Sequence, residues 1–195
     1  MAQPRRLVLA SGSRYRKALL ERLGLQFEVA SPAVDEAPLP KESPAHTALR
    51  LAELKANSLR DAYRDALIIG SDQVAASGAQ RYGKPGTHEK AIQQLRELSG
   101  KAVDFHTAVS LLDARTGDIQ TRLVGCRVVF RSLGDEQIER YLRRERPYDC
   151  SASAKAEGLG IALIERIETE DPTSLIGLPL IALTEMLERA GLPVV

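Results

Sequence analysis

Two consecutive β-like segments constrain the fold of this chain most strongly. Residues 103–113 (VDFHTAVSLLD) and 119–130 (IQTRLVGCRVVF) are rich in β-branched and aromatic residues, and the short segment ARTG between them is typical of a hairpin. A hairpin pairs its strands antiparallel, whereas the chain before it alternates apolar runs with helical patterns. The sequence therefore predicts a mixed α/β fold and argues against a simple doubly wound parallel sheet.

Strand, loop and helix patterns surround this pair. The apolar run at 6–10 leads through the turn SGS into a helical pattern that stops at Gly24. Ser43 and Pro44 start a long amphipathic helix that we expect to continue to about Tyr63. The same patterns predict helices at 87–98, 135–144 and 177–191, and strands at 27–31, 66–74 and 160–168.

Composition limits the classes of function. The 195 residues are 44% hydrophobic and 27% charged, which is ordinary for a globular protein, and no linker divides them, so we expect one domain over 1–195. A net charge of +1, with basic residues spread along the chain, argues against a large nucleic-acid or membrane footprint. The low aromatic content and absence of Trp also argue against a base-stacking binder of polymeric nucleic acid.

Other signals point to a cytoplasmic protein without a preformed metal cluster. Cys126 and Cys150 are too few for a disulfide scaffold, so we expect two reduced thiols, and the three histidines share no metal-ligand spacing. The apolar run LVLA near the start is too short for a signal sequence, and no run approaches the roughly 18 apolar residues of a membrane span.

Asp72 is the first candidate for chemistry. It directly follows the apolar run ALIIG, at the carboxyl end of a predicted buried strand, where ligands bind in open α/β sheets. A carboxylate there needs a hydrogen bond, an ion pair or a metal, although an Asp that only caps a turn is also common. Around it the chain offers Asp35 and Glu36 in a predicted loop, Lys55 on the long helix and Lys84 in a Gly-Lys-Pro turn. This set suits the charge of a triphosphate and a divalent ion.

The loop SGSRYR at 11–16 is the second candidate. Its small residues stand between a strand and a helix start, where free backbone N–H groups bind phosphate. The alternative is that Ser and Gly merely make the bend and cap the helix. No P-loop, GxGxxG or GxSxG pattern occurs in the chain, which disfavours ATPases, dinucleotide enzymes and serine hydrolases.

Seven motifs in order resemble one known family. LASGSRYRKALL, VDE, AELKA, GSDQV, GKP, LSG and GLPL occur in the order and spacing of the Maf-like nucleoside triphosphate pyrophosphatases, nearly end to end. The resemblance implies an acid-anhydride hydrolase that cuts between the α- and β-phosphates and requires a divalent cation, Mg²⁺ or Mn²⁺. It also implies a mixed, strongly bent β-sheet flanked by helices, with two lobes around a central cleft.

The resemblance also assigns roles to individual positions. Asp72 matches the family's proton acceptor, with Glu36 and Asp72 as the carboxylates on the metal side. The positions implied for phosphate binding are Ser13, Arg16, Lys55 and Lys84. The implied partner is a nucleotide, rather than a polymeric nucleic acid or a membrane, and a homodimer stays open.

Three positions bear on the base. This chain has GSDQ and DCSASAKAEG (149–158) where the branch acting on dTTP and UTP has GADT and a DKAGAYGIQG-like segment, so it resembles the 7-methyl-GTP pyrophosphatase branch. We expect Gln73 to contact the base, Glu157 to offset the positive charge of 7-methylguanine, and Tyr15 to stack on it. The alternatives are that Tyr15 packs on the first helix and that Glu157 faces solvent.

The chain departs from the pattern at two places. Arg14 stands where the family has Pro, and Tyr15 where this branch often has Trp. Two other functions remain: a dTTP or UTP pyrophosphatase of the same family, or a nucleotide-binding regulator of septum formation, since the family was first linked to septum inhibition.

Overall fold

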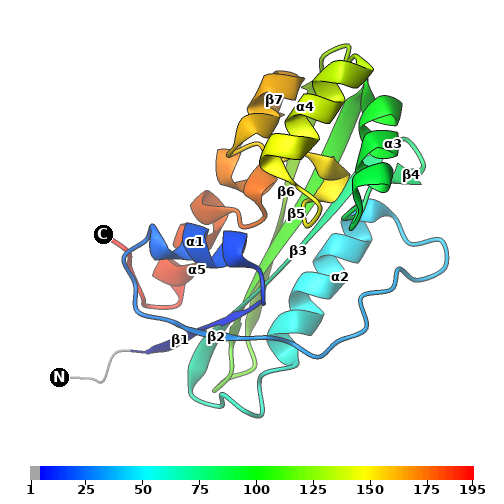
Figure 1. The fold of residues 1–195 in the computed structure, drawn as a ribbon. Coiled ribbons are helices and arrows are strands. Elements are labelled where there is room, and N and C mark those ends of the chain that lie inside the picture. The colour runs from blue at the N-terminus through cyan, green and yellow to red at the C-terminus, as the bar shows by residue number, and fades with distance from the viewer. Residues whose placement is uncertain (1–4) are drawn as a thin grey trace. The chain divides into compact units, whose positions relative to one another are not determined.

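The computed structural model describes residues 5–195, which form a mixed α/β fold (Figure 1). Seven strands lie in one sheet in the order β2-β1-β3-β5-β6-β7, with β4 paired to β3. The strands are β1 (Arg6–Ala10), β2 (Glu28–Ala30), β3 (Ala66–Ser77), β4 (Gln80–Arg81), β5 (Ala102–Asp113), β6 (Ile119–Phe130) and β7 (Ile164–Thr169). The helices are α1 (Arg14–Glu21), α2 (Pro44–Asn57), α3 (His88–Leu98), α4 (Asp135–Glu145) and α5 (Leu180–Arg189), with short 3₁₀ turns at Ser151–Ser153, Leu159–Leu163 and Pro172–Ile176.

The strand pairing confirms the predicted mixture of directions. Strand β1 pairs in parallel with both β2 and β3, whereas β3–β4 and β6–β7 are antiparallel. Strands β5 and β6 are neighbours in the sheet, as the predicted hairpin requires. The turn between them contains Gly117 in the left-handed region (φ 86°), and its N–H donates to the carbonyl of Asp113 at 2.8 Å.

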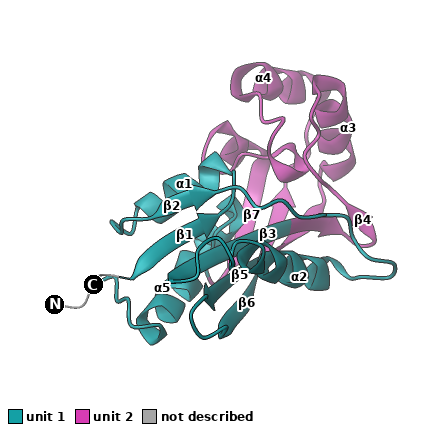
Figure 2. Cartoon of the chain, turned by 90° about the horizontal axis from the view of Figure 1, so that it is seen from below, with its two compact units in different colours: residues 1–73, 107–124, 171–195 teal, residues 74–106, 125–170 magenta. Residues whose placement is uncertain are grey.

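The chain forms two compact units (Figure 2). Unit 1 comprises residues 1–73, 107–124 and 171–195, and unit 2 comprises residues 74–106 and 125–170. Two units agree with the predicted pair of lobes, while the bend of the sheet, the cleft and the single-domain organisation stay predictions.

Unit 1 contains a three-layer core. Along β1, Leu7 and Leu9 face one apolar cluster with α1 and α5, while Val8 and Ala10 face a second cluster beside α2. Successive strand residues point to opposite faces, so helices cover both sides of β1 and β3 (Figure 1). This double burial explains why both strands consist of continuous apolar runs rather than an alternating pattern.

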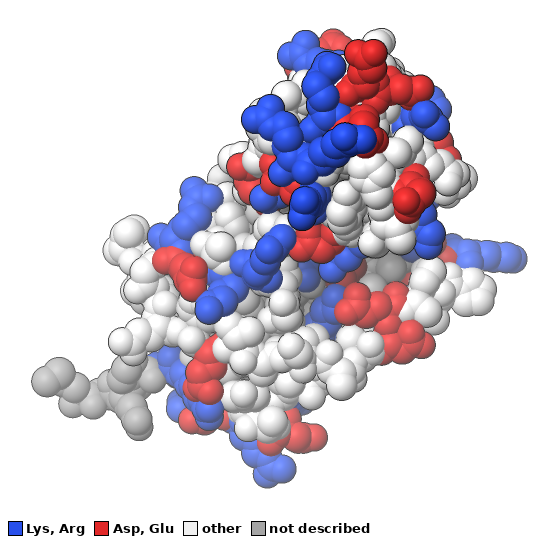
Figure 3. Space-filling view, viewed as in Figure 1, with Lys and Arg blue, Asp and Glu red and all other residues white. Residues whose placement is uncertain are grey.

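Unit 2 contains α3 and α4, which pack side by side (Figure 1). On its outer face α4 carries alternating charges, with ion pairs between Glu136 and Arg140 and between Glu139 and Arg143. Figure 3 shows basic side chains beside acidic ones over this helix. Acidic and basic side chains therefore alternate on the exposed face of α4. No helix in residues 5–195 is long and apolar enough to cross a membrane.

Several predicted boundaries are wrong. Strand β3 continues to Ser77, where it pairs with β4, so Asp72 lies within the strand rather than at its carboxyl end. Helix α5 begins at Leu180 rather than at 177, because Pro179 is its N-cap.

Helix α2 ends at Asn57 rather than near Tyr63, because the chain turns there and the Tyr63 ring packs on the second apolar cluster. The last strand begins at Ile164 rather than at 160, because the preceding residues form a 3₁₀ turn with Gly160 packed against Lys155.

Candidate active site

One buried lysine organises the polar cluster of unit 1. The Lys55 Nζ atom, on α2, lies 2.7 Å from Asp72 Oδ1 on β3 and 3.0 Å from Glu36 Oε1. Lys55 is only 4% exposed and Asp72 only 6%, whereas the Glu36 side chain is 58% exposed. The ammonium therefore connects a buried carboxylate to a solvent-accessible one.

A glycine allows this contact. A Cβ added to Gly70 would lie 2.1 Å from the carbonyl oxygen of Ala52 and 2.8 Å from the amide nitrogen of Ala56. The backbone of α2 therefore approaches β3 closely at Ala52 and Ala56, and a side chain at position 70 would not fit. This close approach lets the Lys55 side chain reach Asp72 at the end of the apolar run.

Arg16 adds a second cation. Its Nε donates to the Gly177 carbonyl at 2.8 Å, and its guanidinium interacts electrostatically with Asp72 and Glu36. Burial lowers the pKa of Arg16 below its ordinary value, and the two carboxylates oppose this shift. Because an arginine has such a high ordinary pKa, the group stays cationic near neutral pH.

The Asp72 carboxyl has a raised pKa. Burial is the main cause, and the nearby Lys55 and Arg16 partly oppose it, while Glu36 raises the pKa further. A carboxyl in this environment is a better proton acceptor than a free aspartate, because its conjugate acid is weaker. Such a perturbed group beside cations is typical of a functional site.

Ser13 lies beside this cluster in sequence but has a structural partner. It is the N-cap of α1, and its Oγ accepts from the Arg16 N–H at 3.4 Å. The cap orients the first turn of α1, from which Arg16 projects. Ser13 thus caps the helix, which is the alternative considered for the first loop. Its phosphate-binding role stays a prediction.

Gln73 has a fixed amide orientation. Its Nε2 donates to Thr107 Oγ1 (3.0 Å) and to the carbonyls of Ser174 (2.9 Å) and Leu175 (3.0 Å). Thr107 Oγ1 itself donates to the Ser174 carbonyl, so it meets the Gln73 amide as an acceptor. Turning the amide over would place its oxygen against two carbonyls. Gln73 therefore has only its oxygen left to accept a hydrogen bond from a ligand.

Tyr15 has a cation on one face. The Arg14 Cζ atom lies 4.8 Å from the centroid of the Tyr15 ring, and an Arg14 guanidinium nitrogen donates to the Tyr15 hydroxyl at 2.8 Å. The residue that replaces the family's Pro thus contacts the ring that was predicted to stack on a base. This contact shows that the ring can hold a planar cation.

The remaining predicted residues, Lys84 and Glu157, belong to unit 2. Both are exposed, Lys84 in the GKP turn and Glu157 in the loop that precedes β7. Unit 1 thus brings together Arg16, Glu36, Lys55 and Asp72. Whether Lys84 and Glu157 act with them stays a prediction.

Comparison with known proteins places this arrangement in a family. Residues 6–190 match the Maf-like protein family. This chain belongs to that family. Maf-like relatives named 7-methyl-GTP pyrophosphatase share 59% identity in Thiobacillus denitrificans and 55% in Cupriavidus metallidurans, each over 96% of this chain and 94% of the relative. A relative of the same name from Burkholderia orbicola shares 54% identity over 99% of this chain and 93% of the relative. A solved HAM1 protein from Coxiella burnetii aligns with a TM-score of 0.45 and 16% identity, over 65% of this chain and 73% of that chain.

The sequence reasoning missed the residues that anchor this Maf-like site. Ser71 is fully buried, and its Oγ lies 2.8 Å from the Ala108 carbonyl and 2.9 Å from the Gly177 carbonyl. The carbonyl that orients Arg16 is therefore also fixed to the strand that carries Asp72. The 3₁₀ turn before Gly177 begins at Pro172, and its N-cap is Asp171, whose side chain accepts a hydrogen bond from the Thr173 N–H. The pattern Asp-Pro-Thr-Ser at 171–174 was the available signal, because it is a typical helix start.

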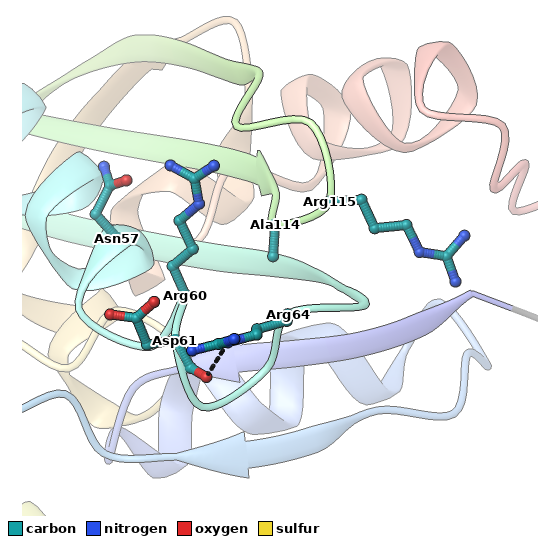
Figure 4. A pocket seen from close by; sticks show the side chains of 6 residues that line it. All are labelled: Asn57, Arg60, Asp61, Arg64, Ala114 and Arg115. Atoms are coloured by element: carbon teal, nitrogen blue, oxygen red, sulfur yellow. Dashed lines mark hydrogen bonds between the residues drawn. The ribbon is translucent and has the colours of Figure 1, made fainter.

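An open pocket of about 500 Å³ in unit 1 lies away from this cluster. It is lined by Asn57, Arg60, Asp61, Arg64, Ala114 and Arg115 (Figure 4). Ala114, which lines the pocket, donates its N–H to the carbonyl of Ala66, the first residue of β3. Ala66 stands six positions before Asp72, so about 20 Å of strand separates the two residues. The three guanidinium groups point in different directions in Figure 4, so they do not form a common anion site.

Proposed function

We propose that this Maf-like protein is a nucleoside triphosphate pyrophosphatase that prefers 7-methyl-GTP. The observation that carries the proposal is the contact of Lys55 with both Asp72 and Glu36, beside Arg16. It combines a proton acceptor, an accessible carboxylate and two cations in unit 1. The names of the relatives, which are 53–59% identical over most of the chain, support both the reaction and the base.

Asp72 is the general base of the proposed reaction. A water oxygen forms a bond to phosphorus, the bond of the α–β anhydride breaks, and the water proton moves to the Asp72 carboxylate. The products are a nucleoside monophosphate and pyrophosphate. The raised pKa of Asp72 favours this proton transfer, while Lys55 keeps enough of the carboxyl ionised to act.

Arg16 and Lys55 stabilise the charge that develops on the phosphates. Both side chains are held before substrate binds, Arg16 by the Gly177 carbonyl and Lys55 by the two carboxylates. Fixed cations lose little energy to reorganisation as charge moves to the leaving pyrophosphate. Lys84, from the GKP turn, is the proposed third cation.

A divalent cation fits the donors of this cluster. Mg²⁺ is usually bound by one or two carboxylates together with substrate phosphates and water, and Asp72 and Glu36 both approach one ammonium within 3.0 Å. In residues 5–195, groups of three or more His, Cys, Asp or Glu side chains that could hold a metal ion without substrate are absent. We therefore propose Glu36 and Asp72 as its ligands, where Mg²⁺ or Mn²⁺ would offset phosphate charge.

The base preference rests on three side chains. Guanine presents N–H donors on its Watson–Crick edge, and the fixed amide of Gln73 offers an acceptor alone. Glu157 would offset the positive charge of 7-methylguanine, and Tyr15 would stack on the ring, as the Arg14 guanidinium does. A thymine or uracil ring, which is neutral and smaller, would benefit less from this set.

Pyrophosphate release from 7-methyl-GTP, GTP, dTTP and UTP, with magnesium or manganese, tests the proposal. We expect the highest kcat/KM for 7-methyl-GTP and a loss of activity with chelator. Fast turnover of dTTP or UTP with none of 7-methyl-GTP would overturn the base assignment. Binding of nucleotides without any turnover would instead favour the nucleotide-binding regulator of septum formation.

The cellular setting follows from the proposed substrate. Free nucleotides are the partner, and we place the reaction in the cytoplasm, where such nucleotides are formed. A homodimer also belongs to the proposal, and the dependence of specific activity on protein concentration tests it.

A further inference from the structure

The loop that carries Glu157 has an unusual backbone. Arg146, Ala152 and Ser153, all between the end of α4 at Glu145 and the 3₁₀ turn at Leu159–Leu163, adopt positive φ angles of 51°, 56° and 55°. Residues other than glycine rarely adopt this conformation, and it persists only where the surroundings fix it. Something in unit 2 must therefore hold this loop in place.

Glu145 provides the main contacts. Its Oε1 accepts from Lys155 Nζ at 2.6 Å, and its Oε2 accepts from the backbone N–H of Leu159 at 2.6 Å. In the sequence, Lys155 and Leu159 stand two positions before and two positions after Glu157. The Glu145 side chain is 9% exposed, so solvent competes little for the ion pair.

The position of Glu145 argues for a role outside its own helix. It is the last residue of α4, where the helix dipole disfavours a negative charge. The ion pair with Lys155 compensates for this, since it lowers the pKa of Glu145 and raises that of Lys155. A carboxylate that served only the helix would be better placed in the first turn.

The fit around Glu145 is close. A Cβ added to Gly158 would lie 2.6 Å from Glu145 Oε2. The carboxylate therefore occupies the space that a side chain at 158 would need. Gly158, the residue next to Glu157, thus packs against the same carboxylate that accepts from Lys155 and Leu159.

Further hydrogen bonds hold the first half of the loop. The Tyr141 hydroxyl, also on α4, donates to the Ser153 carbonyl at 3.1 Å and accepts from the Lys155 N–H at 3.0 Å. Ser153 Oγ donates to Gln94 Oε1 at 2.6 Å, and Gln94 Nε2 donates to the Gly83 carbonyl at 3.1 Å. Gly83 precedes Lys84, so the GKP turn and the Glu157 loop belong to one network.

We propose that Glu145 is a positioning residue for base recognition, which fixes segment 155–159 and thereby holds Glu157 for the positively charged base. The inference rests on the proposed role of Glu157 as the base contact. Glu145 itself touches the loop rather than the substrate. Without it, the loop would sample other conformations and Glu157 would meet the base less often.

Steady-state kinetics on 7-methyl-GTP and GTP test the inference. We expect Glu145→Ala to raise the KM for 7-methyl-GTP by about tenfold with kcat within about twofold of wild type, because a misplaced contact weakens binding. Glu145→Gln keeps an acceptor of the same shape and should restore part of the loss. Lys155→Met removes the same ion pair from the other side, and it serves if Glu145→Ala fails to fold.

Two controls separate positioning from general damage. Glu136→Gln changes a carboxylate on the same helix whose side chain is 95% exposed, and it should leave all constants unchanged. In a Glu157→Gln background, Glu145→Ala should have no further effect on the preference for 7-methyl-GTP over GTP. Hydrogen exchange at residues 155–160 should become faster in Glu145→Ala, whatever the substrate.

The outcomes are distinguishable. The positioning role would be overturned if Glu145→Ala left the rate of hydrogen exchange at residues 155–160 unchanged. It would also be overturned if this variant lost kcat/KM equally on 7-methyl-GTP and GTP. If Glu157→Gln loses the preference for 7-methyl-GTP while Glu145→Ala keeps it, only this inference fails. If wild type ignores 7-methyl-GTP, or Glu157→Gln keeps wild-type preference, the proposed base contact fails and the positioning role fails with it.

Discussion

Replacing Asp72 with Asn is the most direct test of the proposed chemistry. The two side chains have nearly the same shape, so the amide oxygen can still accept from Lys55 Nζ, which lies 2.7 Å away. The countercharge also survives in part, because Glu36 Oε1 remains 3.0 Å from the same ammonium. The variant therefore removes a proton acceptor while it keeps most of the packing.

The two expected magnitudes differ widely. Loss of a general base costs about 10²–10⁴ in kcat. At about 1.36 kcal/mol per tenfold, that is about 2.7–5.4 kcal/mol of activation free energy. The free energy of unfolding should change by less than about 2 kcal/mol, because the neutral amide avoids the desolvation of a buried charge and Lys55 keeps a partner.

The assay measures turnover, nucleotide binding and unfolding on the same preparations. Pyrophosphate release gives kcat, calorimetry gives nucleotide affinity, and urea unfolding gives the free energy of unfolding. Asp113→Asn is the matched control, because Asp113 is a partly buried carboxylate of unit 1 that pairs with Arg5 at 2.7 Å. It should leave kcat unchanged. Turnover of Asp72→Asn within about threefold of wild type would refute the role of Asp72 as base.

Three further predictions follow from the same contacts. Burial raises the pKa of Asp72 above 3.8, and the carboxylate acts as a base only above this raised pKa. The value of kcat/KM should therefore fall as the pH drops through a value higher than 3.8. A profile of kcat/KM that stays flat down to pH 3.8 would contradict this. Gly70→Ala should lower the free energy of unfolding by about 1–3 kcal/mol in urea titrations, because the new methyl group would meet the α2 backbone. The control is Gly125→Ala in β6, because Gly125 has an ordinary φ and its added Cβ meets no atom within 4 Å; equal effects would argue against the close approach. Arg14→Ala should lower the KM for 7-methyl-GTP by about two- to thirtyfold, because it uncovers a ring face worth about 0.5–2 kcal/mol to a cation, and an unchanged KM would remove Tyr15 from the base site.

Local sequence patterns were sufficient for most of the fold. The apolar run of β3, the caps of α2 and α3 at Ser43 and Thr87, and the β5–β6 pair all appear where expected. The errors occurred where tertiary packing competes with local pattern. The helical pattern continues beyond Asn57, but the apolar cluster beside α2 takes up Tyr63 from a turn instead.

The candidate site divides in the same way. The sequence by itself determined that a carboxylate directly follows the apolar run that stops at Gly70, but it wrongly ended the strand near Asp72, because β3 continues to Ser77 and Asp72 lies within it. It also supplied the helix cap at Ser13 and the order of the family motifs. These features depend on neighbours within a few positions along the chain.

Only the tertiary structure decided which groups meet. Lys55 reaches Asp72 across 17 positions because Gly70 lets a helix backbone approach the strand. The Gln73 amide is turned by carbonyls that lie 101 and 102 positions away, which no local pattern encodes. The physical reason is that hydrogen bonds and desolvation act over a few ångströms in space, whatever the separation in sequence.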